Sequence, residues 1–417
     1  MATRGLIVSY YFPPVGGGGV QRWVKFIKYL NRRDWDFTVI TAEIEESSPS
    51  DESLLAELPK SVKIIRAGPE KPFKSYKNHI NLRLRRGYWQ RWMSAFVHVV
   101  DSRKKWNNII KPYIEKEISQ GKYDALIFTI PPYSLGTLAA DFTAGHDIPV
   151  FLDLRDPWTI NPYKIHPTPV HAYLDRRSER SAISGINNFI SAYQSTLDHF
   201  DKYIDNFTPD KAILIPNGFD IEDFIGLEPE PLPVRGKFNL GFSGTFYSHL
   251  NNPRYLFLAL RLLREAGYDV HFHHVGSSIY DISKPAKKYN IQNQVHKWSY
   301  QEHKKCLQIL KSMDALCIIL DERIKHADKT VGGKLYEYLG LKKPVLAMVP
   351  REGEAAKIIN ETNSGIVCSS IDVTQICQAV KQIITGQRIF TFEDIERYSR
   401  EEQALQLKSF LEARLKK

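Results

Sequence analysis

The sequence predicts an α/β protein with two doubly wound parallel sheets, one in each half of the chain. Three observations carry this prediction. Short apolar runs alternate with longer amphipathic segments throughout, which is typical of parallel strands joined by helices. The segment 226–236 holds three prolines and two glycines in eleven residues, which marks a linker. The same alternation then starts again after this segment.

In the first half, apolar runs predict strands at 6–9, 37–41, 62–67, 125–129, 150–154, 188–191 and 212–215. Helix-like segments lie between these runs, at 20–33, 134–144 and 170–184. We therefore assign 1–225 to a first domain and 226–236 to the linker.

In the second half, the predicted strands are 239–243, 270–275, 295–297, 315–319, 345–348 and 366–368. The predicted helices are 253–265, 301–311, 333–341, 353–360 and 373–384. We assign 237–395 to a second domain and 396–417 to a terminal helix with leucines at 405, 407, 411 and 415. Because ligands of doubly wound sheets bind beyond the carboxyl ends of the strands, two facing sheets imply a cleft between the domains.

The composition is that of a folded chain. Its 417 residues are 43% hydrophobic, 12% aromatic and 25% charged, which excludes a disordered chain, a collagen and a disulfide scaffold. No apolar run approaches the ~18–20 residues that span a bilayer, and we see no signal-peptide pattern. The four cysteines form no CxxC pair, so we expect reduced thiols and a cytoplasmic location.

The net charge of +10 is concentrated in one stretch, 60–122, where 16 Lys/Arg stand against 4 Asp/Glu. Arginines 83, 85 and 86 precede Trp89 and Trp92, so cations alternate with aromatic rings. Such a stretch suits an anionic membrane surface, and it also suits nucleic acid or a merely solvated basic face. We expect the membrane surface and no nucleic-acid partner.

Four consecutive glycines, Gly16, Gly17, Gly18 and Gly19, follow the first strand and open the first helix. Glycines let a backbone approach a ligand closely, and the N–H groups of a helix start favour an anion. The loop lacks the GxGxxG dinucleotide pattern, because Gln21 stands where the third glycine belongs. A flexible turn is the alternative, but we expect a ligand-binding loop.

A second motif, Asp153-Leu-Arg155-Asp156-Pro-Trp158, ends a strand of the first domain. Two carboxylates at a strand end point to a site, and Asp156 is suited to orient or deprotonate an acceptor hydroxyl. The alternative is an Asp–Arg ion pair followed by a turn.

Three small-residue turns follow further strands. Asn217 lies in a Pro-Asn-Gly turn before the linker, where a plain turn is the simpler interpretation. Gly244 and Thr245 end the first strand of the second domain, and Gly276 and Ser277 end the next one. Such turns admit a phosphate or a sugar closely.

The segment Lys334-Leu-Tyr336-Glu337-Tyr-Leu-Gly is a short helix before a buried strand. Lys334 and Glu337 are three residues apart and share one face. A carboxylate there can accept hydrogen bonds from both hydroxyls of a ribose, and a lysine one turn earlier can neutralise a diphosphate. The alternative is a surface ion pair of small energy.

No metal site is predicted. Asp34-Trp35-Asp36 is formally a DxD pair, but it lies before a strand and is interpreted as a turn. The thirteen histidines show no HExxH spacing, and His271, His273 and His274 lie on one predicted strand, where core or edge roles are expected.

Taken in order, these motifs resemble those of the GT-B glycosyltransferases, specifically family 4. The resemblance spans about residues 5–395, and KLYEYLGLKKPVLA and PNGFD are its most specific parts. It implies two Rossmann-like domains, a terminal helix that crosses back to the first domain, and a nucleotide-sugar donor held mainly by the second domain. It also implies retention of anomeric configuration without a required metal or other cofactor.

Carried over by position, the resemblance implies that Glu337 holds the ribose and that Lys334 and Gly244 lie near the diphosphate. Gly17 and Gly18 would approach that diphosphate from the first domain. Asp156 would then lie on the acceptor side.

The sequence departs from the family pattern at two places. Lys329 stands where a glutamate often precedes the ribose glutamate by eight residues, and Thr245 begins a segment that lacks the usual arginine and lysine. We expect Lys329 and Lys334 to supply that positive charge, with Arg254 as a weaker option. The predicted catalytic residues are Asp156, Lys334 and Glu337, and the predicted substrate contacts are Gly16, Gly17, Gly18, Gly19, Asn217, Gly244, Thr245, Ser277, Lys329 and Tyr336.

The sequence therefore predicts a cytoplasmic glycosyltransferase on the inner face of the membrane. Its acceptor would be a saccharide or a lipid-linked saccharide of cell-envelope polysaccharide assembly. The alternatives are a nucleotide-sugar epimerase of the same architecture, which needs no acceptor, and a non-catalytic module that binds nucleotide or glycan.

Overall fold

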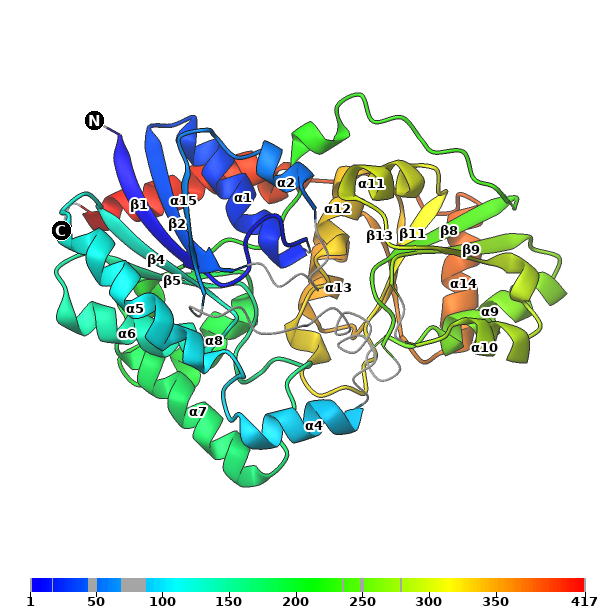
Figure 1. Cartoon of the computed structure of the whole chain (residues 1–417). Coiled ribbons are helices and arrows are strands. Elements are labelled where there is room, and N and C mark those ends of the chain that lie inside the picture. The colour runs from blue at the N-terminus through cyan, green and yellow to red at the C-terminus, as the bar shows by residue number, and fades with distance from the viewer. Residues whose placement is uncertain are drawn as a thin grey trace. The chain divides into compact units, whose positions relative to one another are not determined.

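The computed structural model describes residues 2–16, 18–43, 51–68, 88–234, 236–247, 251–277 and 280–415. These residues form two compact units (Figure 1). The first unit holds 1–217 together with 400–417, and the second holds 218–399. Each unit contains one parallel sheet, so the two predicted doubly wound domains are confirmed.

The sheet of the first unit has the strand order β3-β2-β1-β4-β5-β6-β7, and the pairs between its neighbours are parallel. Chain order reverses at β1 and β4, as in a doubly wound fold. The strands are β1 (Thr3–Ser9), β2 (Trp35–Ala42), β3 (Lys63–Ala67), β4 (Ala125–Ile130), β5 (Val150–Leu154), β6 (Phe189–Ser191) and β7 (Ala212–Leu214).

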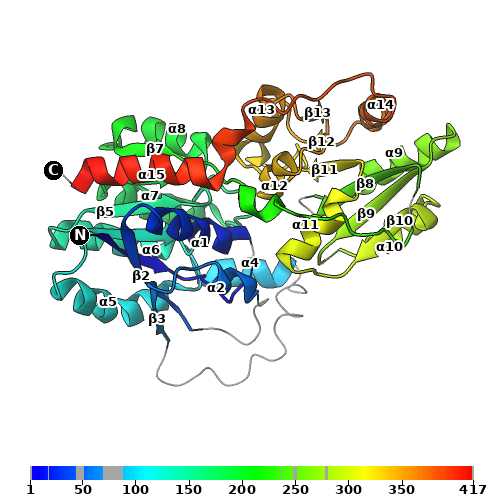
Figure 2. The same cartoon turned by 90° about the horizontal axis from the view of Figure 1, so that it is seen from above.

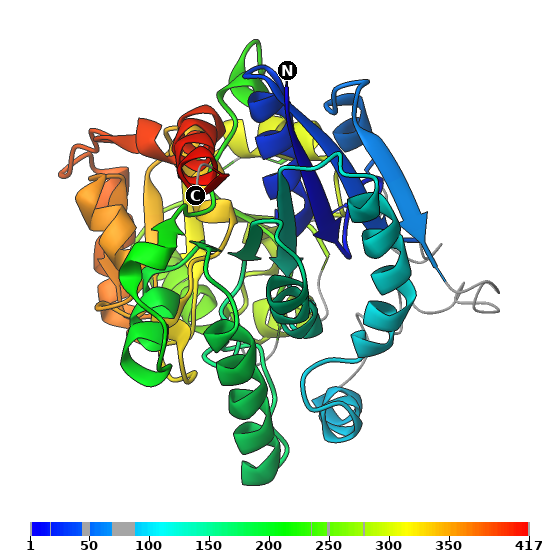
Figure 3. The ribbon, with the colours of Figure 1, turned by 90° about the vertical axis from the view of Figure 1, so that its left-hand side faces the viewer.

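Helices cover both faces of this sheet, because successive strand residues point to opposite sides. Leu6 and Val8 face α5 and α6, whereas Ile7 between them faces α1. The view in Figure 3 shows helices on either side of these strands. The described helices are α1 (Gly18–Asn31), α2 (Ser53–Ala56), α4 (Tyr88–Val97), α5 (Lys104–Ser119), α6 (Ser134–Gly145), α7 (Pro169–Ser184), α8 (Gln194–Tyr203) and the 3₁₀ turn η1 (Pro209–Lys211).

The terminal helix, α15 (Arg400–Leu415), belongs to the first unit, as the resemblance implied. It lies beside α1 (Figure 2) and buries Leu407 and Leu411 in the core that α1 shares with the sheet. Leu405, unlike Leu407 and Leu411, is exposed. Its neighbour Ala404 lies on the buried stripe instead, three residues before Leu407.

The sheet of the second unit has the order β10-β9-β8-β11-β12-β13, again with parallel pairs. Its strands are β8 (Phe238–Ser243), β9 (Val270–Val275), β10 (Val295–Trp298), β11 (Ala315–Ile319), β12 (Val345–Met348) and β13 (Gly365–Cys368). One face packs on α9 (Arg254–Glu265), α10 (Ser283–Lys288) and α14 (Val373–Ile384). Three further helices contact the sheet: α11 (His303–Lys311), α12 (Lys334–Gly340) and α13 (Glu354–Glu361). The 3₁₀ turns are η2 (Ile221–Phe224), η3 (Gln292–Gln294), η4 (Ala327–Lys329) and η5 (Ile395–Tyr398).

The segment 226–236, predicted as a linker, belongs to the second unit. Glu230 N donates to Gln308 O at 3.0 Å, and Lys311 Nζ donates to Leu227 O at 2.5 Å, so this segment is bonded to α11. Among the described residues, no helix is long and apolar enough to cross a bilayer.

Candidate functional site

Two glycine turns meet at the carboxyl end of the second sheet. Gly244 follows β8 and Gly276 follows β9, with φ of +135° and +134°, which L side chains rarely adopt. Gly244 N donates to Val275 O at 3.0 Å, and a Cβ on Gly276 would lie 2.6 Å from Gly244 O. The motifs around Gly244 and Gly276 are therefore in contact, which also places the half-buried Thr245 and Ser277 beside these turns.

We expect Gly276→Ala to lower the free energy of unfolding by about 2–3 kcal/mol, because the new Cβ is both strained and too close to Gly244. Gly386→Ala is the matched control, since φ there is +65° with open space around the Cβ, and it should cost only about 1 kcal/mol. Calorimetric unfolding compares the two variants. Equal costs would contradict the close packing of the two turns.

Both backbone polar groups of Gly244 are engaged within the protein. Its N–H is already donated to Val275, and its carbonyl oxygen accepts from His274 Nε2 at 2.8 Å. Burial lowers the pKa of His274, so this imidazole is neutral at physiological pH and holds the turn. Gly244 thus permits close backbone approach but does not offer its own N–H to a diphosphate.

A buried carboxylate lies on α12 beside this edge of the sheet. Lys334 Nζ is 3.0 Å from both oxygens of Glu337, and His303 Nε2 is 3.4 Å from Oε1. Glu337 is 7% exposed, whereas the Lys334 side chain is 33% exposed. Burial opposes ionisation of Glu337, but Lys334 and His303 outweigh it and hold its pKa at about 2. Glu337 is therefore a fully ionised acceptor that is paired with a partly exposed lysine.

His303 is the member of this group that sequence reasoning missed. His303 is the first residue of α11. The two helices α11 and α12 are separated in sequence and come together only in the folded second unit. Burial alone would lower the pKa of His303. The hydrogen bond and the negative charge of Glu337 raise it by more, so the pKa of His303 lies above its ordinary value. Its Nδ1 lies 3.9 Å from Asp223 Oδ2, which adds a second carboxylate to the same ring.

Two other predicted residues of the second unit do not join this group. Tyr336 is 1% exposed and packs its ring 5.4 Å from that of Tyr398, so it is a core residue rather than a substrate contact. Lys329 lies in η4, and its Nζ is 2.9 Å from Asp328 Oδ2.

In the first unit, the glycine loop packs against the second motif. Gly18 and Gly19 begin α1, and Gly19 O accepts from Arg155 Nη1 at 2.5 Å. A Cβ on Gly19 would lie 3.0 Å from that guanidinium, so a larger residue here would have to displace Arg155 slightly. Gly16 is half-buried, and Gly17 lies outside the described residues.

Asp153 is a structural carboxylate. It is fully buried and bound by Arg22 at 3.0 Å, by Trp23 Nε1 at 2.8 Å and by Thr129 Oγ1 at 2.9 Å. These bonds tie α1 to β4 and β5 in the interior of the first unit. For Asp153, the ion-pair alternative holds, although its partner is Arg22 and not Arg155.

We expect Asp153→Asn to lower the free energy of unfolding of the first unit by about 2–3 kcal/mol, because buried Arg22 loses its counter-charge. Urea unfolding followed by tryptophan fluorescence measures this, since six of the seven tryptophans precede residue 218. The exposed Asp141→Asn is the control and should change little. A loss below 1 kcal/mol would argue against a structural role.

Asp156 has a different environment from Asp153. It is half-buried, and no hydrogen bond to it is recorded among the described residues. Burial and the neighbouring Asp153 raise its pKa to about 6, although Arg155 and Arg22 oppose the shift. A carboxyl group that titrates near neutrality is suited to exchange a proton with a substrate hydroxyl.

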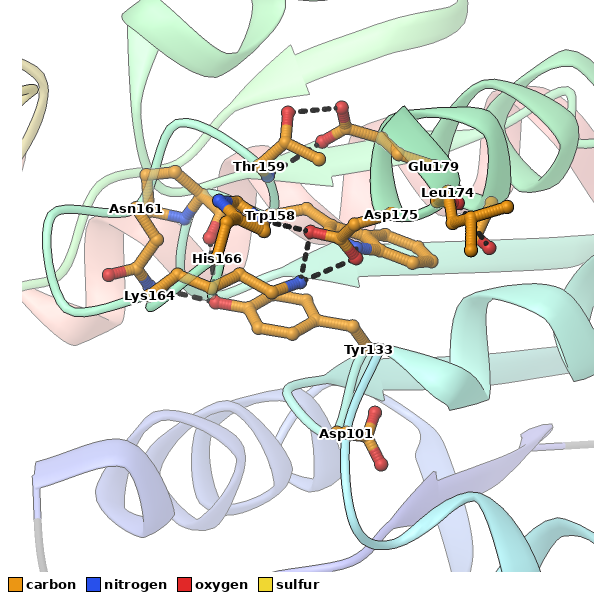
Figure 4. Close-up of polar contacts among 12 residues, drawn as sticks. Asp101, Tyr133, Trp158, Thr159, Asn161, Lys164, His166, Leu174, Asp175 and Glu179 are labelled. Atoms are coloured by element: carbon orange, nitrogen blue, oxygen red, sulfur yellow. Dashed lines mark hydrogen bonds and ion pairs between the residues drawn. The ribbon is translucent and has the colours of Figure 1, made fainter. Parts of the chain in front are cut away.

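The loop after Asp156 is held by two buried carboxylates of α7 (Figure 4). Asp175 accepts from Trp158 Nε1 at 3.0 Å and from Lys164 Nζ at 2.7 Å, and it lies 2.8 Å from His166 Nε2. Glu179, one turn later, accepts from Thr159 N at 3.0 Å. These bonds fix the loop and therefore the position from which Asp156 projects.

Asn217, the last residue of the first unit's main segment, contributes its backbone to packing. Asn217 O accepts from Gln403 Nε2 of α15 at 3.2 Å, and the residue is half-buried. Within either unit, no three described His, Cys, Asp or Glu side chains lie close enough to share a metal ion.

Comparison with known proteins bears on the second unit most directly. Residues 237–386 match the family model described as "Glycosyl transferases group 1". No curated protein sequence matches the chain.

Several solved structures share the whole fold. Sucrose-phosphate synthase from Thermosynechococcus elongatus has a TM-score of 0.71 at 12% identity, covering 99% of this chain and 98% of that one. HepE from Anabaena, in complex with UDP and glucose, has a TM-score of 0.66 at 13% identity, covering 99% and 100%. A putative UDP-N-acetylglucosamine 2-epimerase from Listeria monocytogenes has a TM-score of 0.57 at 10% identity, covering 100% and 97%. The second unit thus contains a segment similar to the glycosyl transferases group 1 model, and the whole chain shares its fold with these solved structures.

Proposed function

We propose that this protein moves a sugar from a nucleoside diphosphate to an acceptor hydroxyl. The observation that carries the proposal is the ionised Glu337, which lies with Lys334 inside the stretch that matches a glycosyltransferase family model. We propose further that the acceptor is a saccharide or a lipid-linked saccharide of cell-envelope polysaccharide assembly. From the family 4 resemblance we propose retention of configuration, with no metal and no cofactor required.

Glu337 would accept hydrogen bonds from the two ribose hydroxyls. Its pKa of about 2 keeps it ionised at every physiological pH, and a carboxylate has lone pairs left beyond those that Lys334 uses. Lys334 is one-third exposed, so it can turn toward a diphosphate while His303 stays on Glu337. The lysine would then stabilise the negative charge that develops on the leaving diphosphate.

Asp156 of the first unit would orient or deprotonate the acceptor hydroxyl. Its pKa of about 6 leaves it mostly ionised at pH 7, which is the form that accepts a proton. The turns at Gly244, Thr245 and Ser277 would bring backbone close to the donor. We also propose a cytoplasmic enzyme that works on the inner face of the membrane through the basic stretch 60–122.

The experiment that tests this proposal is a panel of UDP-, GDP-, ADP- and dTDP-sugars. We expect one donor to raise the melting temperature, and the same donor to give up its sugar to an acceptor with a chelator present. Release of an epimerised sugar nucleotide without transfer would identify the epimerase instead. A thermal shift without turnover would identify a non-catalytic module that binds the nucleotide.

A further inference from the structure

Two helices that are far apart in sequence expose apolar side chains side by side in the first unit. Met93, Phe96 and Val97 of α4 are exposed, and so are Val170, Tyr173 and Leu174 of α7. Val97 and Val170 are 67% and 62% exposed, which is unusual for aliphatic side chains. We call these six side chains the α4–α7 patch.

Three contacts hold α4 against α7 and the loop before it. His171 Nε2 donates to Phe96 O at 3.0 Å, and the two rings lie 5.0 Å apart. Arg91 Nη2 donates to Tyr163 O at 2.9 Å, which ties α4 to the loop before α7. Figure 1 shows α4 next to the end of α7. The patch is therefore one surface and not two separate ones.

The segments that carry the patch, together with the first half of α5, are positively charged. Segments 88–111 and 160–177 together hold eight Lys/Arg and two Asp/Glu. Both carboxylates are engaged within the protein, because Asp175 is buried among Lys164, His166 and Trp158, and Asp101 accepts from Ser134 N at 2.7 Å. The exposed charges are therefore cations, namely Lys104, Lys105, Lys111, Arg176 and Arg177.

We infer that the α4–α7 patch is the surface by which this protein docks on an anionic lipid bilayer. Aliphatic and aromatic side chains would enter the boundary between headgroups and acyl chains, while the surrounding cations would contact lipid phosphates. Nucleic-acid sites rely mainly on cations and stacked aromatic rings, whereas exposed valine, leucine and methionine together with cations suit the bilayer better. The inference deepens the proposed membrane association, because it names its surface, and it adds α7, which lies outside the basic stretch 60–122.

The test is co-sedimentation of the full chain with vesicles of phosphatidylcholine alone or with added phosphatidylglycerol. We expect binding only to the anionic vesicles. The variant Arg176→Glu with Arg177→Glu should bind them at least tenfold more weakly. The variant Phe96→Ser, Val97→Ser and Tyr173→Ser should also bind more weakly, and its loss should persist at high salt, where charge is screened.

Matched controls come from the second unit. Ile389→Ser removes a side chain that is 80% exposed, and Lys287→Glu with Lys288→Glu reverses two adjacent exposed helix cations. Both control variants should bind vesicles as the wild type does. Melting temperatures confirm that every variant is folded.

Three outcomes would overturn the inference: no binding of wild type to anionic vesicles, binding that the patch variants retain, or binding of an oligonucleotide that the patch variants alone lose. The donor-induced thermal shift is measured on the same proteins. It reports on the proposed sugar transfer separately, because none of the substituted residues lies among the donor-site residues.

Discussion

Replacing Glu337 with glutamine is expected to lower sugar transfer at least a hundredfold. The amide has the same shape, but it offers one acceptor oxygen in place of two and carries no charge. Hydrogen bonds to a charged group are worth about 1.5–3 kcal/mol each, so losing one of them costs roughly ten- to a hundredfold in affinity or rate, and losing both costs at least about a hundredfold. The measurements are donor affinity by calorimetry and the rate of transfer.

The same substitution has a smaller effect on stability. Since Lys334 is one-third exposed, solvent screens the pair, and we expect a loss of about 1–2 kcal/mol. The folded-state pKa of Glu337 is lowered to about 2, so its contribution is present above the ordinary pKa of a glutamate and is lost as pH falls toward 2. The wild type should therefore lose this increment between about pH 4.5 and pH 2, and the variant should not.

Glu361→Gln is the matched control for this experiment. Glu361 pairs with Arg397 at 2.8 Å on the surface of the same unit, and its side chain is 41% exposed. This variant should transfer sugar normally. If Glu337→Gln also transferred normally, Glu337 would be only a partner for Lys334, and the assignment of the donor site would fail.

The strands could be predicted well because parallel strands buried on both faces are nearly continuous apolar runs. The bounds of helix α5 are less evident from the sequence, although Trp106, Ile110 and Ile114 form a buried stripe at intervals of four residues. The lysines between these residues give the segment a basic composition that obscures this period. Helix α8 is also weakly marked, because only a few of its residues are buried.

In the candidate site, a contact within one helix can be predicted from the sequence, whereas a contact between two helices cannot. The pair of Lys334 and Glu337 is one helical turn apart, so its spacing alone predicts the contact. His303 reaches Glu337 only through the packing of two helices, which no local pattern records. Likewise Tyr336 is polar enough to suggest a ligand contact, but its place on α12 turns it into the core.

The two carboxylates of the motif at 153–158 also have different roles that the sequence does not separate. Asp153 is the fourth residue of β5 and is fully buried, where it pairs with Arg22 and holds the fold together. Asp156 comes three residues later, beyond the end of β5, and is only half-buried. The sequence places both at a strand end, but only the structure shows that one is used for packing and the other is left to titrate.

Asp156→Asn is expected to lower transfer about a thousandfold, which is within the range for loss of a general base. The pKa of Asp156 is about 6, so wild-type activity should fall about tenfold for each pH unit below 6, as the carboxylate takes up a proton. An asparagine cannot titrate, so the residual activity of the variant should lack this acidic limb. Asp141→Asn, at an exposed position on α6, should keep both the rate and the limb.

The stability of the Asp156→Asn variant should not fall with its activity. A carboxyl group whose folded-state pKa is raised destabilises the fold once it ionises, so the wild type should lose stability as pH rises from about 4 to above 6. At pH 7 the neutral asparagine removes this penalty, and we expect Asp156→Asn to be as stable as the wild type or more stable by about 1 kcal/mol. A residue that serves only packing would show a loss of stability together with the loss of activity. Lower stability at pH 7, or an acidic limb that persists in the variant, would therefore remove Asp156 from the acceptor site.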